Sequence, residues 1–287
     1  MINLFYHDLC SYINRLSGHR FEIIFVDDGS RDATLEKIQS LAEYDQRIKY
    51  VSFSRNFGKE SALYAGLSYS KGDLVAVMDA DLQDPPLLLP DMIREIESGY
   101  DCVATRRVTR TGEPIIRSFF ARQFYKLIKR TSNVDMVDGA RDYRMMTRQV
   151  VDAILSMQEY HRFSKGIFGW VGFKTHWIPY ENVERAAGET SWSFWKLFAY
   201  ALEGIIAFTV MPLRVASFSG ILFSCLAFIY LIYIVIRTFV LGIDIPGYAS
   251  TIAVVLFMGG IQLVSVGVLG EYMARTYMEV KQRPAFI

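Results

Sequence analysis

Two carboxylates one residue apart follow an apolar run in the first third of the chain. The run Leu74–Met78 predicts a buried strand, and Asp79-Ala80-Asp81 then begins a turn that Pro85-Pro86 closes. Carboxylates at a strand end suit a hard divalent cation, because Mg²⁺ and Mn²⁺ prefer oxygen ligands and are often completed by phosphates. The alternative is a simple strand cap, since aspartate is common in turns.

Polar residues also follow the other strands that we predict before the middle of the chain. The predicted strands are 21–26, 48–53, 73–78 and 101–105. Helices separate them, which is typical of an α/β fold with a mainly parallel sheet that binds ligands beyond the carboxyl ends of its strands. We therefore expect these polar residues on one edge of the sheet. They are Asp27, Asp28, Ser54, Arg55, Asp79, Asp81 and Arg106.

Composition argues against a nucleic-acid partner. The 31 basic and 30 acidic side chains leave a formal net charge of +1, so no basic excess would hold a polyanion. Cys10, Cys102 and Cys225 are too widely spaced for a metal motif or a disulfide framework, which fits a reducing compartment. No glycine-rich phosphate loop of the dinucleotide or P-loop type is present.

The last third of the chain is predicted to meet a membrane. Residues 191–214 form an aromatic amphipathic helix that we expect in the membrane interface. Residues 215–240 and 245–270 are each long enough to span a hydrocarbon core of about 30 Å. The predicted domains are thus 1–190, 191–214 and the hairpin with its tail, 215–287.

Charge next to the spans predicts their orientation. Arg214 precedes the first span, Arg275, Lys281 and Arg283 follow the second, and the short connection between the spans has no lysine or arginine. By the positive-inside rule, residues 1–190 and the tail lie in the cytoplasm. The predicted location is therefore the cell membrane, with the large domain on its cytoplasmic face.

Four motifs occur in a fixed order along the chain. They are Phe25-Val26-Asp27-Asp28-Gly29-Ser30, Ser54-Arg55-Asn56-Phe57-Gly58-Lys59-Glu60, Met78-Asp79-Ala80-Asp81-Leu82-Gln83-Asp84-Pro85 and Arg185-Ala186-Ala187-Gly188-Glu189. With the two apolar spans, they resemble the family 2 glycosyltransferases that act on polyprenyl phosphate. These include the bactoprenol glucosyltransferases of the GtrB type and, more distantly, dolichyl-phosphate mannose synthase. The resemblance extends over essentially the whole chain.

The resemblance implies a fold and a reaction. The fold would be GT-A, which is Rossmann-like, and the reaction an inverting transfer of a sugar from a nucleotide sugar to undecaprenyl phosphate. Glucose and a UDP-sugar are the commonest choices in the family, and N-acetylglucosamine, mannose and amino-arabinose stay open. The lipid-linked product would serve cell-envelope glycosylation, with a separate lipid flippase and a downstream transferase as partners.

The resemblance also implies roles for individual residues. Asp79, Asp81 and Gln83 would hold Mg²⁺ or Mn²⁺ with the donor pyrophosphate, and Asp81 would be catalytic. Asp142 would orient the acceptor or act as a weak base, unless it is a structural partner of Arg144. The residues expected at the donor are Val26, Asp28, Ala80, Arg106 and Arg185. The residues expected at the acceptor phosphate are Arg117 and Arg122, on a basic helix predicted over 114–130 whose alternative role is a solvated face.

The chain departs from the family pattern at three places. A family strand with a Pro-Val-Tyr-Asn-Glu-Glu-like motif would precede residue 1, and without it we expect an unpaired edge beside the strand 21–26 and an incomplete donor site. Arg141 replaces a usual glycine, and Ser191 replaces a usual lysine. The missing strand and Ser191 favour one alternative function, a catalytically impaired, membrane-anchored nucleotide-sugar-binding or scaffold protein.

Two further alternatives concern assembly and product. A processive polysaccharide synthase is disfavoured, because a growing polymer needs a channel and the chain has two spans and no Gln-x-x-Arg-Trp sequence. Gly259, Gly260 and Gly267 in the second span would permit close helix packing, which leaves a homo-oligomer open.

Overall fold

The structure of the 287-residue chain is a computed structural model. The structure describes residues 1–107, 137, 139–157, 159–160, 162–180, 206, 209–241 and 247–287. The chain forms two compact units. The first comprises Met1–Gly204 and Arg283–Ile287, and the second comprises Ile205–Gln282.

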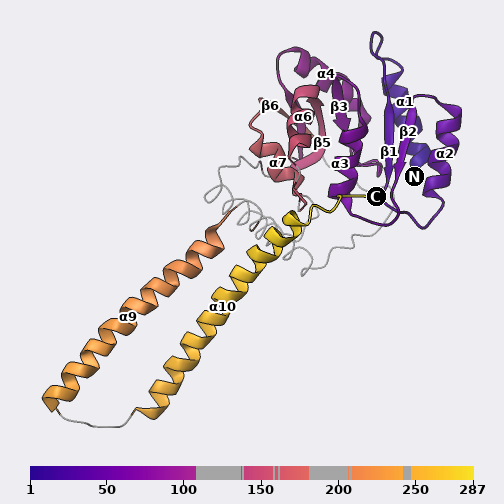
Figure 1. Cartoon of the computed structure of the whole chain (residues 1–287). Helices are drawn as coiled ribbons and strands as arrows, with labels where there is room; N and C mark the ends of the chain where they lie inside the picture. Colours follow the sequence, from indigo (N-terminus) through magenta and orange to yellow (C-terminus); the bar gives the residue numbers. More distant parts are fainter. Residues whose placement is uncertain are drawn as a thin grey trace. The chain divides into compact units, whose positions relative to one another are not determined.

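The described part of the first unit is an α/β domain with six strands in two sheets (Figure 1). The first sheet is the pair β1 (Ile23–Asp27) and β2 (Ile48–Ser52). The second sheet has the order β3 (Leu74–Val77), β5 (Ala140–Thr147), β4 (Cys102–Arg107) and β6 (Thr175–Tyr180). The helices are α1 (Ile2–Ile13), α2 (Thr34–Tyr44), α3 (Lys59–Tyr69), the 3₁₀ turn η1 (Pro86–Leu88), α4 (Leu89–Glu97), α6 (Arg148–Ser156) and α7 (Ser164–Trp170).

Strand direction differs in part from the prediction of a mainly parallel sheet. β1 and β2 are parallel, and so are β4 and β6, but β5 runs antiparallel to both β3 and β4. The second sheet is therefore mixed. The apolar pattern of a buried strand is the same in either direction, so the sequence pattern did not reveal this reversal. β4 also continues to Arg107, so Arg106 lies within the strand and not beyond its end.

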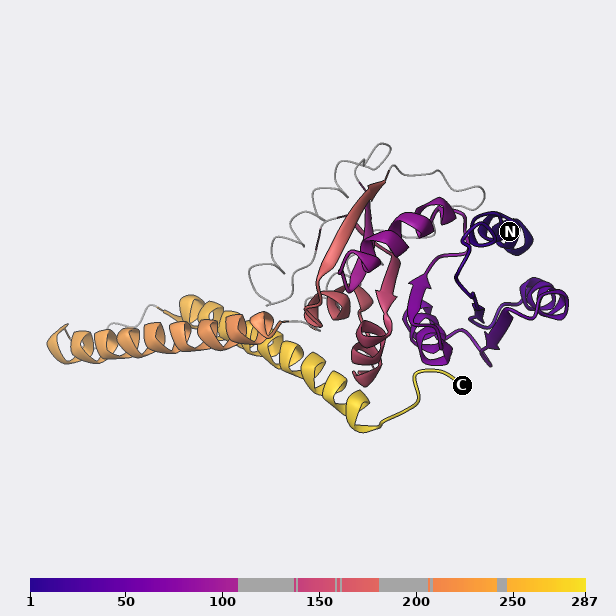
Figure 2. The same ribbon diagram turned by 90° about the horizontal axis from the view of Figure 1, so that it is seen from above.

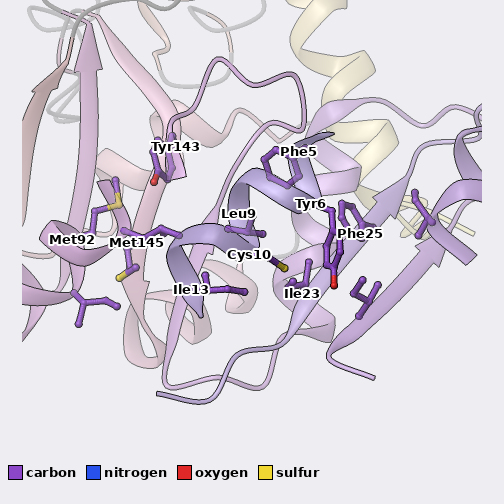
Figure 3. Close-up of a cluster of buried hydrophobic side chains, with 14 of the residues drawn as sticks. Phe5, Tyr6, Leu9, Cys10, Ile13, Ile23, Phe25, Met92, Tyr143 and Met145 are labelled. Carbon is purple, nitrogen blue, oxygen red and sulfur yellow. The ribbon is translucent and has the colours of Figure 1, made fainter. Parts of the chain in front are cut away.

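Helix α1 connects the two sheets through one hydrophobic cluster (Figure 3). The helix buries Phe5, Tyr6, Leu9, Cys10 and Ile13. On one side of the helix lie Ile23 and Phe25 of β1, and on the other lie Met92, Tyr143 and Met145. Among the described strands, β1 pairs only with β2 and β3 pairs only with β5. Side-chain packing by α1, and not strand pairing, therefore joins the sheets.

The last five residues return to the first unit. The ring of Phe286 stacks on Phe53, with centroids 5.0 Å apart, and lies 6.4 Å from the ring of Tyr64 in α3. The amide of Ser54 donates to the carbonyl oxygen of Ile287 at 2.9 Å. Figures 1 and 2 accordingly show the C-terminus beside α3. The tail thus covers the loop that leads from β2 into α3.

The second unit is a helical hairpin of α9 (Met211–Leu241) and α10 (Tyr248–Val280). Two stretches, Met211–Arg237 and Phe257–Val280, are long and apolar enough to cross a membrane, and their side chains are not buried within the protein. Because α9 begins at Met211, residues 211–214 belong to it and not to the predicted interfacial helix. Most of residues 191–210 lie outside the described residues.

Candidate active site

The turn after β3 carries the carboxylates predicted to bind a metal ion. The amide of Asp79 donates to Oδ2 of Asp84 at 2.9 Å, and the amide of Gln83 donates to Oδ1 of Asp81 at 3.1 Å. Leu82 between them has a φ of +64°, a left-handed conformation that costs a non-glycine residue about 1–2 kcal/mol. Local hydrogen bonds to side-chain oxygens thus define the shape of this turn.

Lys59, the first residue of α3, connects this turn to β5. Its ammonium lies 2.8 Å from Oδ2 of Asp79 and 2.7 Å from Oδ2 of Asp142. Burial acts to lower the pKa of Lys59, but the two carboxylates outweigh it and raise that pKa. No role was predicted for Lys59 from the sequence. Its place in the motif Ser54–Glu60 was the available signal.

Asp142 is held as a carboxylate by the charges around it. Burial acts to raise its pKa, and Lys59 and Lys165 outweigh that effect, so its pKa is lowered. The suggested pairing with Arg144 is not what the structure has. Arg144 donates through Nε to the backbone carbonyl of Asp142 at 3.4 Å, and the Asp142 carboxylate pairs with Lys59.

Arg141, which replaces the family's usual glycine, contacts the far side of the turn after β3. Its guanidinium donates to Oε1 of Gln83 at 3.2 Å and to the hydroxyl of Tyr180 at 3.0 Å, and it lies 3.6 Å from Oδ1 of Asp84. Asp84 is only 1% exposed, and burial raises its pKa to about 6. Arg141 therefore orients a predicted metal ligand, which the sequence did not indicate.

The loop after β1 is ordered by the carboxylate of Asp28. One oxygen accepts from the amide of Phe57 at 2.6 Å, and the other accepts from the amide of Gly58 at 2.9 Å. Gly29 has a φ of +66°, and a Cβ there would lie 2.5 Å from the carbonyl carbon of Arg55. The two loops therefore approach too closely for a side chain at Gly29, and Asp28 joins them just before Lys59.

The other predicted donor residues have varied settings. Val26 is half-buried on β1, and its side chain faces Gly66 of α3. Ala80 packs against the hydrophobic cluster, and the side chain of Arg106 is exposed near the end of β4. Three predicted residues lie outside the described residues, so their positions stay predictions. They are Arg117, Arg122 and Arg185.

The donor set of the β3 turn fits a divalent cation of the magnesium type. Asp79, Asp81 and Gln83 offer two carboxylates and one amide oxygen, and Mg²⁺ commonly uses one or two carboxylates with substrate phosphates. Within the described ranges, no three acidic, histidine or cysteine side chains gather at one point. The side chain of Asp79 is 36% exposed and pairs with the ammonium of Lys59. A cation at this turn would therefore replace the charge that Lys59 now supplies.

These features agree with a match between the chain and known families. The fold is that of the GT-A-like glycosyltransferases. Residues 6–155 match the family described as "Glycosyl transferase family 2", and residues 211–276 match the "GtrB C-terminal hairpin". The chain belongs to glycosyl transferase family 2, and the protein is a glycosyltransferase.

Individual relatives resemble the chain over nearly its whole length. It is 46% identical over 267 residues to the "Putative glycosyltransferase CsbB" of Bacillus subtilis, which covers 93% of this chain and 81% of the relative. It is 41% identical over 286 residues to the "Prophage bactoprenol glucosyl transferase homolog" of Escherichia coli, with 100% of this chain and 93% of the relative covered. The "Bactoprenol glucosyl transferase" of Shigella phage SfII is also 41% identical, with 100% and 92% covered.

Proposed function

We propose that this protein transfers glucose from a nucleotide sugar to polyprenyl phosphate at a membrane surface. The main support is the pair of ion contacts made by Lys59, whose ammonium joins Asp142 of β5 to Asp79 in the turn after β3. The same chain also has two apolar helices that are long enough to cross a membrane. The names of the bactoprenol glucosyl transferase relatives support glucose and a polyprenol.

On the donor side, the proposal assigns Mg²⁺ or Mn²⁺ to Asp79, Asp81 and Gln83. Bound there, the cation would stabilise the negative charge that develops on the departing nucleoside diphosphate. A UDP-sugar is the donor that we favour. Further contacts with the nucleotide or its phosphates are assigned to Val26, Asp28, Ala80, Arg106 and Arg185. Because the carboxylate of Asp28 already binds two amides, its contribution includes shaping the loop at residues 54–58.

On the acceptor side, little proton transfer is needed. A phosphate monoester has a second pKa of about 6, so most of it is fully ionised at pH 7 and is already a nucleophile. The lowered pKa of Asp142 makes it a poor proton acceptor. We therefore assign to Asp142 the orientation of the acceptor through Lys59, and to Arg117 and Arg122 contacts with the acceptor phosphate. Direct displacement at the anomeric carbon would invert its configuration.

The arrangement at the membrane follows from charge. Arg214 lies in the first turn of α9, and Lys281 and Arg283 follow α10, which supports a cytoplasmic location for the first unit. The lipid-linked glucose would then form on the cytoplasmic face. A separate flippase and a downstream transferase would be needed to use it outside.

The test is a transfer assay with the purified full-length protein in detergent or vesicles. Labelled UDP-glucose, UDP-N-acetylglucosamine and GDP-mannose are each supplied with undecaprenyl phosphate and Mn²⁺, and lipid-extracted label is counted. We expect label in lipid from UDP-glucose, loss of that label with EDTA, and loss with Asp81→Ala. The matched control is Asp152→Ala, whose carboxylate is 64% exposed on α6.

Two results would contradict the proposal. Lipid label from none of these donors, together with retained UDP binding, would favour a nucleotide-sugar-binding or scaffold role. Equal transfer activity of Asp81→Ala and Asp152→Ala would show that the Asp81 carboxylate is not needed for the reaction.

A further inference from the structure

A cavity of about 260 Å³ lies on the face of β5 and β6 that α7 covers. Its lining includes two cationic side chains, Arg144 and Lys165, and three aromatic ones, Phe168, Phe173 and Trp177. None of the four motifs includes these residues. The cavity belongs entirely to the first unit.

On the cationic wall of the cavity, Arg144 is buried and is held in place by neighbouring groups. Arg144 is 3% exposed, and its guanidinium carbon lies 3.4 Å from the ring centroid of Phe168. One guanidinium nitrogen donates to the carbonyl of Arg141 at 3.0 Å. These contacts orient Arg144 without neutralising its charge, because backbone carbonyls and an aromatic ring carry no net charge.

Lys165 adds a second positive charge, and the residues that the structure describes give it no close counterion. The carboxylate of Asp142 acts on the charge of Lys165, but Lys59 already binds that carboxylate at 2.7 Å. Among the described residues, no carboxylate oxygen lies within 4.0 Å of the Lys165 ammonium. Burial lowers the pKa of Lys165. An anion in the cavity would therefore gain two charge-assisted contacts and relieve the repulsion between them.

The aromatic wall and the size of the cavity restrict which anion fits. Phe168, Phe173 and Trp177 offer apolar surface beside the two cations, which suits an anion that carries a hydrocarbon chain. The cavity is smaller than the range of about 300–1,000 Å³ typical of sites for drug-sized ligands. It would hold a phosphate group and the first part of a chain, but not a whole nucleotide sugar.

The cavity also lies close to the proposed reaction. The carboxylate of Asp142, two residues before Arg144 on β5, lies within electrostatic range of both Lys165 and Arg144. Through Lys59, Asp142 is connected to Asp79 in the turn after β3. An anion bound at Lys165 would therefore lie next to the carboxylate to which we assigned the orientation of the acceptor.

We propose that this cavity binds a phosphate monoester with its attached apolar chain, and that Lys165 and Arg144 hold the phosphate while the aromatic wall holds the first part of the chain. Identifying that ester as the lipid acceptor rests on the proposed function. The site adds to the contacts expected from Arg117 and Arg122.

A binding measurement tests the cavity without turnover. Farnesyl phosphate, farnesol and inorganic phosphate are each titrated into the purified full-length protein while its thermal unfolding is followed. We expect farnesyl phosphate to bind at least tenfold more tightly than either of the other two. We also expect Lys165→Met to weaken it about tenfold, and Lys165→Arg to restore part of the loss. The matched control is Lys37→Met, an exposed lysine on α2.

A kinetic measurement separates the acceptor from the donor. In the transfer assay, Lys165→Met should raise the KM for undecaprenyl phosphate about tenfold and leave the KM for the sugar donor within twofold. Equal binding of farnesyl phosphate by Lys165→Met and Lys37→Met would overturn the proposal, and so would a rise in the donor KM alone. If Lys165→Met does not fold, Lys165→Gln serves in both measurements.

The two proposals can fail separately. If the wild-type protein transfers no sugar but binds farnesyl phosphate through Lys165, the proposed transfer reaction is wrong and the proposed role of the cavity is supported. If transfer occurs and the Lys165 variants bind and react like the control, the reaction stands and the cavity assignment is wrong.

Discussion

The ammonium of Lys59 lies 2.7 Å from the carboxylate of Asp142, and the same ammonium lies 2.8 Å from Asp79. One side chain at the start of α3 thus holds together the turn after β3 and the middle of β5. Lysine carries a single positive charge, so it compensates these two carboxylates only in part. A divalent cation bound to Asp79 would therefore compete with the Lys59 ammonium for the Asp79 carboxylate.

We expect Lys59→Met to change metal binding more than stability. Because the Lys59 side chain is 54% exposed, solvent screens the pair, and the free energy of unfolding should fall by only about 1 kcal/mol. Removing a competitor worth about 1 kcal/mol should tighten Mn²⁺ binding about fivefold in the absence of donor. A Mn²⁺ titration followed by electron paramagnetic resonance measures this. Lys59→Arg, which keeps the charge, is the control, and unchanged Mn²⁺ affinity in Lys59→Met would contradict the competition.

Arg141→Ala should weaken metal binding. Arg141 donates to Oε1 of Gln83 and lies 3.6 Å from Asp84, so its loss frees the amide that we assign as a metal ligand. Loss of groups that orient a metal ligand typically costs about 10–100-fold in affinity. The Mn²⁺ concentration for half-maximal transfer should rise about tenfold. Arg94→Ala, at an exposed arginine of α4, is the matched control, and an equal response of both variants would exclude this role.

Gly29→Ala should destabilise the first unit. The added Cβ would lie 2.5 Å from the carbonyl carbon of Arg55, and the φ of +66° is unfavourable for alanine. Backbone strain and overpacking together predict a loss of about 2–4 kcal/mol in the free energy of unfolding. Gly18→Ala is the control, because Gly18 has a φ of +92° and no atom within 4 Å of the added Cβ. Urea unfolding should show a loss of only about 1 kcal/mol there, and equal losses would argue against the close approach.

Glu60 should make stability depend on pH. One of its carboxylate oxygens accepts from the amide and hydroxyl of Ser164. Burial raises the pKa of Glu60 above its ordinary value of 4.5, although the hydrogen bonds from Ser164 oppose this. The folded protein therefore holds this proton more tightly than the unfolded chain, and the stability gained at low pH is lost as the pH rises through the raised pKa.

The variant Glu60→Gln isolates this effect, because an amide does not titrate. The free energy of unfolding of the wild type, minus that of Glu60→Gln, should decrease as the pH rises above the ordinary value of 4.5 toward neutrality. Glu97→Gln, at an exposed position of α4, provides the control for general effects of charge. A difference that is constant over this pH range would contradict the raised pKa.

Much of the fold was predictable because its signals are local. The alternation of apolar strands with helices, the carboxylates after β3 and the two apolar C-terminal helices are patterns within short stretches of sequence. Each follows from the periodicity of one element or from the chemistry of one turn. The four motifs extended this to the family, and the match of residues 6–155 confirmed it.

The contacts between distant segments were not predictable, because no local pattern records which strands and side chains meet. Reversal of β5, the packing of α1 between the sheets and the stacking of Phe286 on Phe53 all depend on partners far away in sequence. The same holds for Lys59, which a sequence presents only as a lysine near a helix start. The sequence by itself determined the class of reaction and indicated the carboxylates after β3 as a candidate metal site. Only the tertiary structure decided that Lys59 bridges Asp79 and Asp142, because that bridge requires α3, β3 and β5 to be packed together.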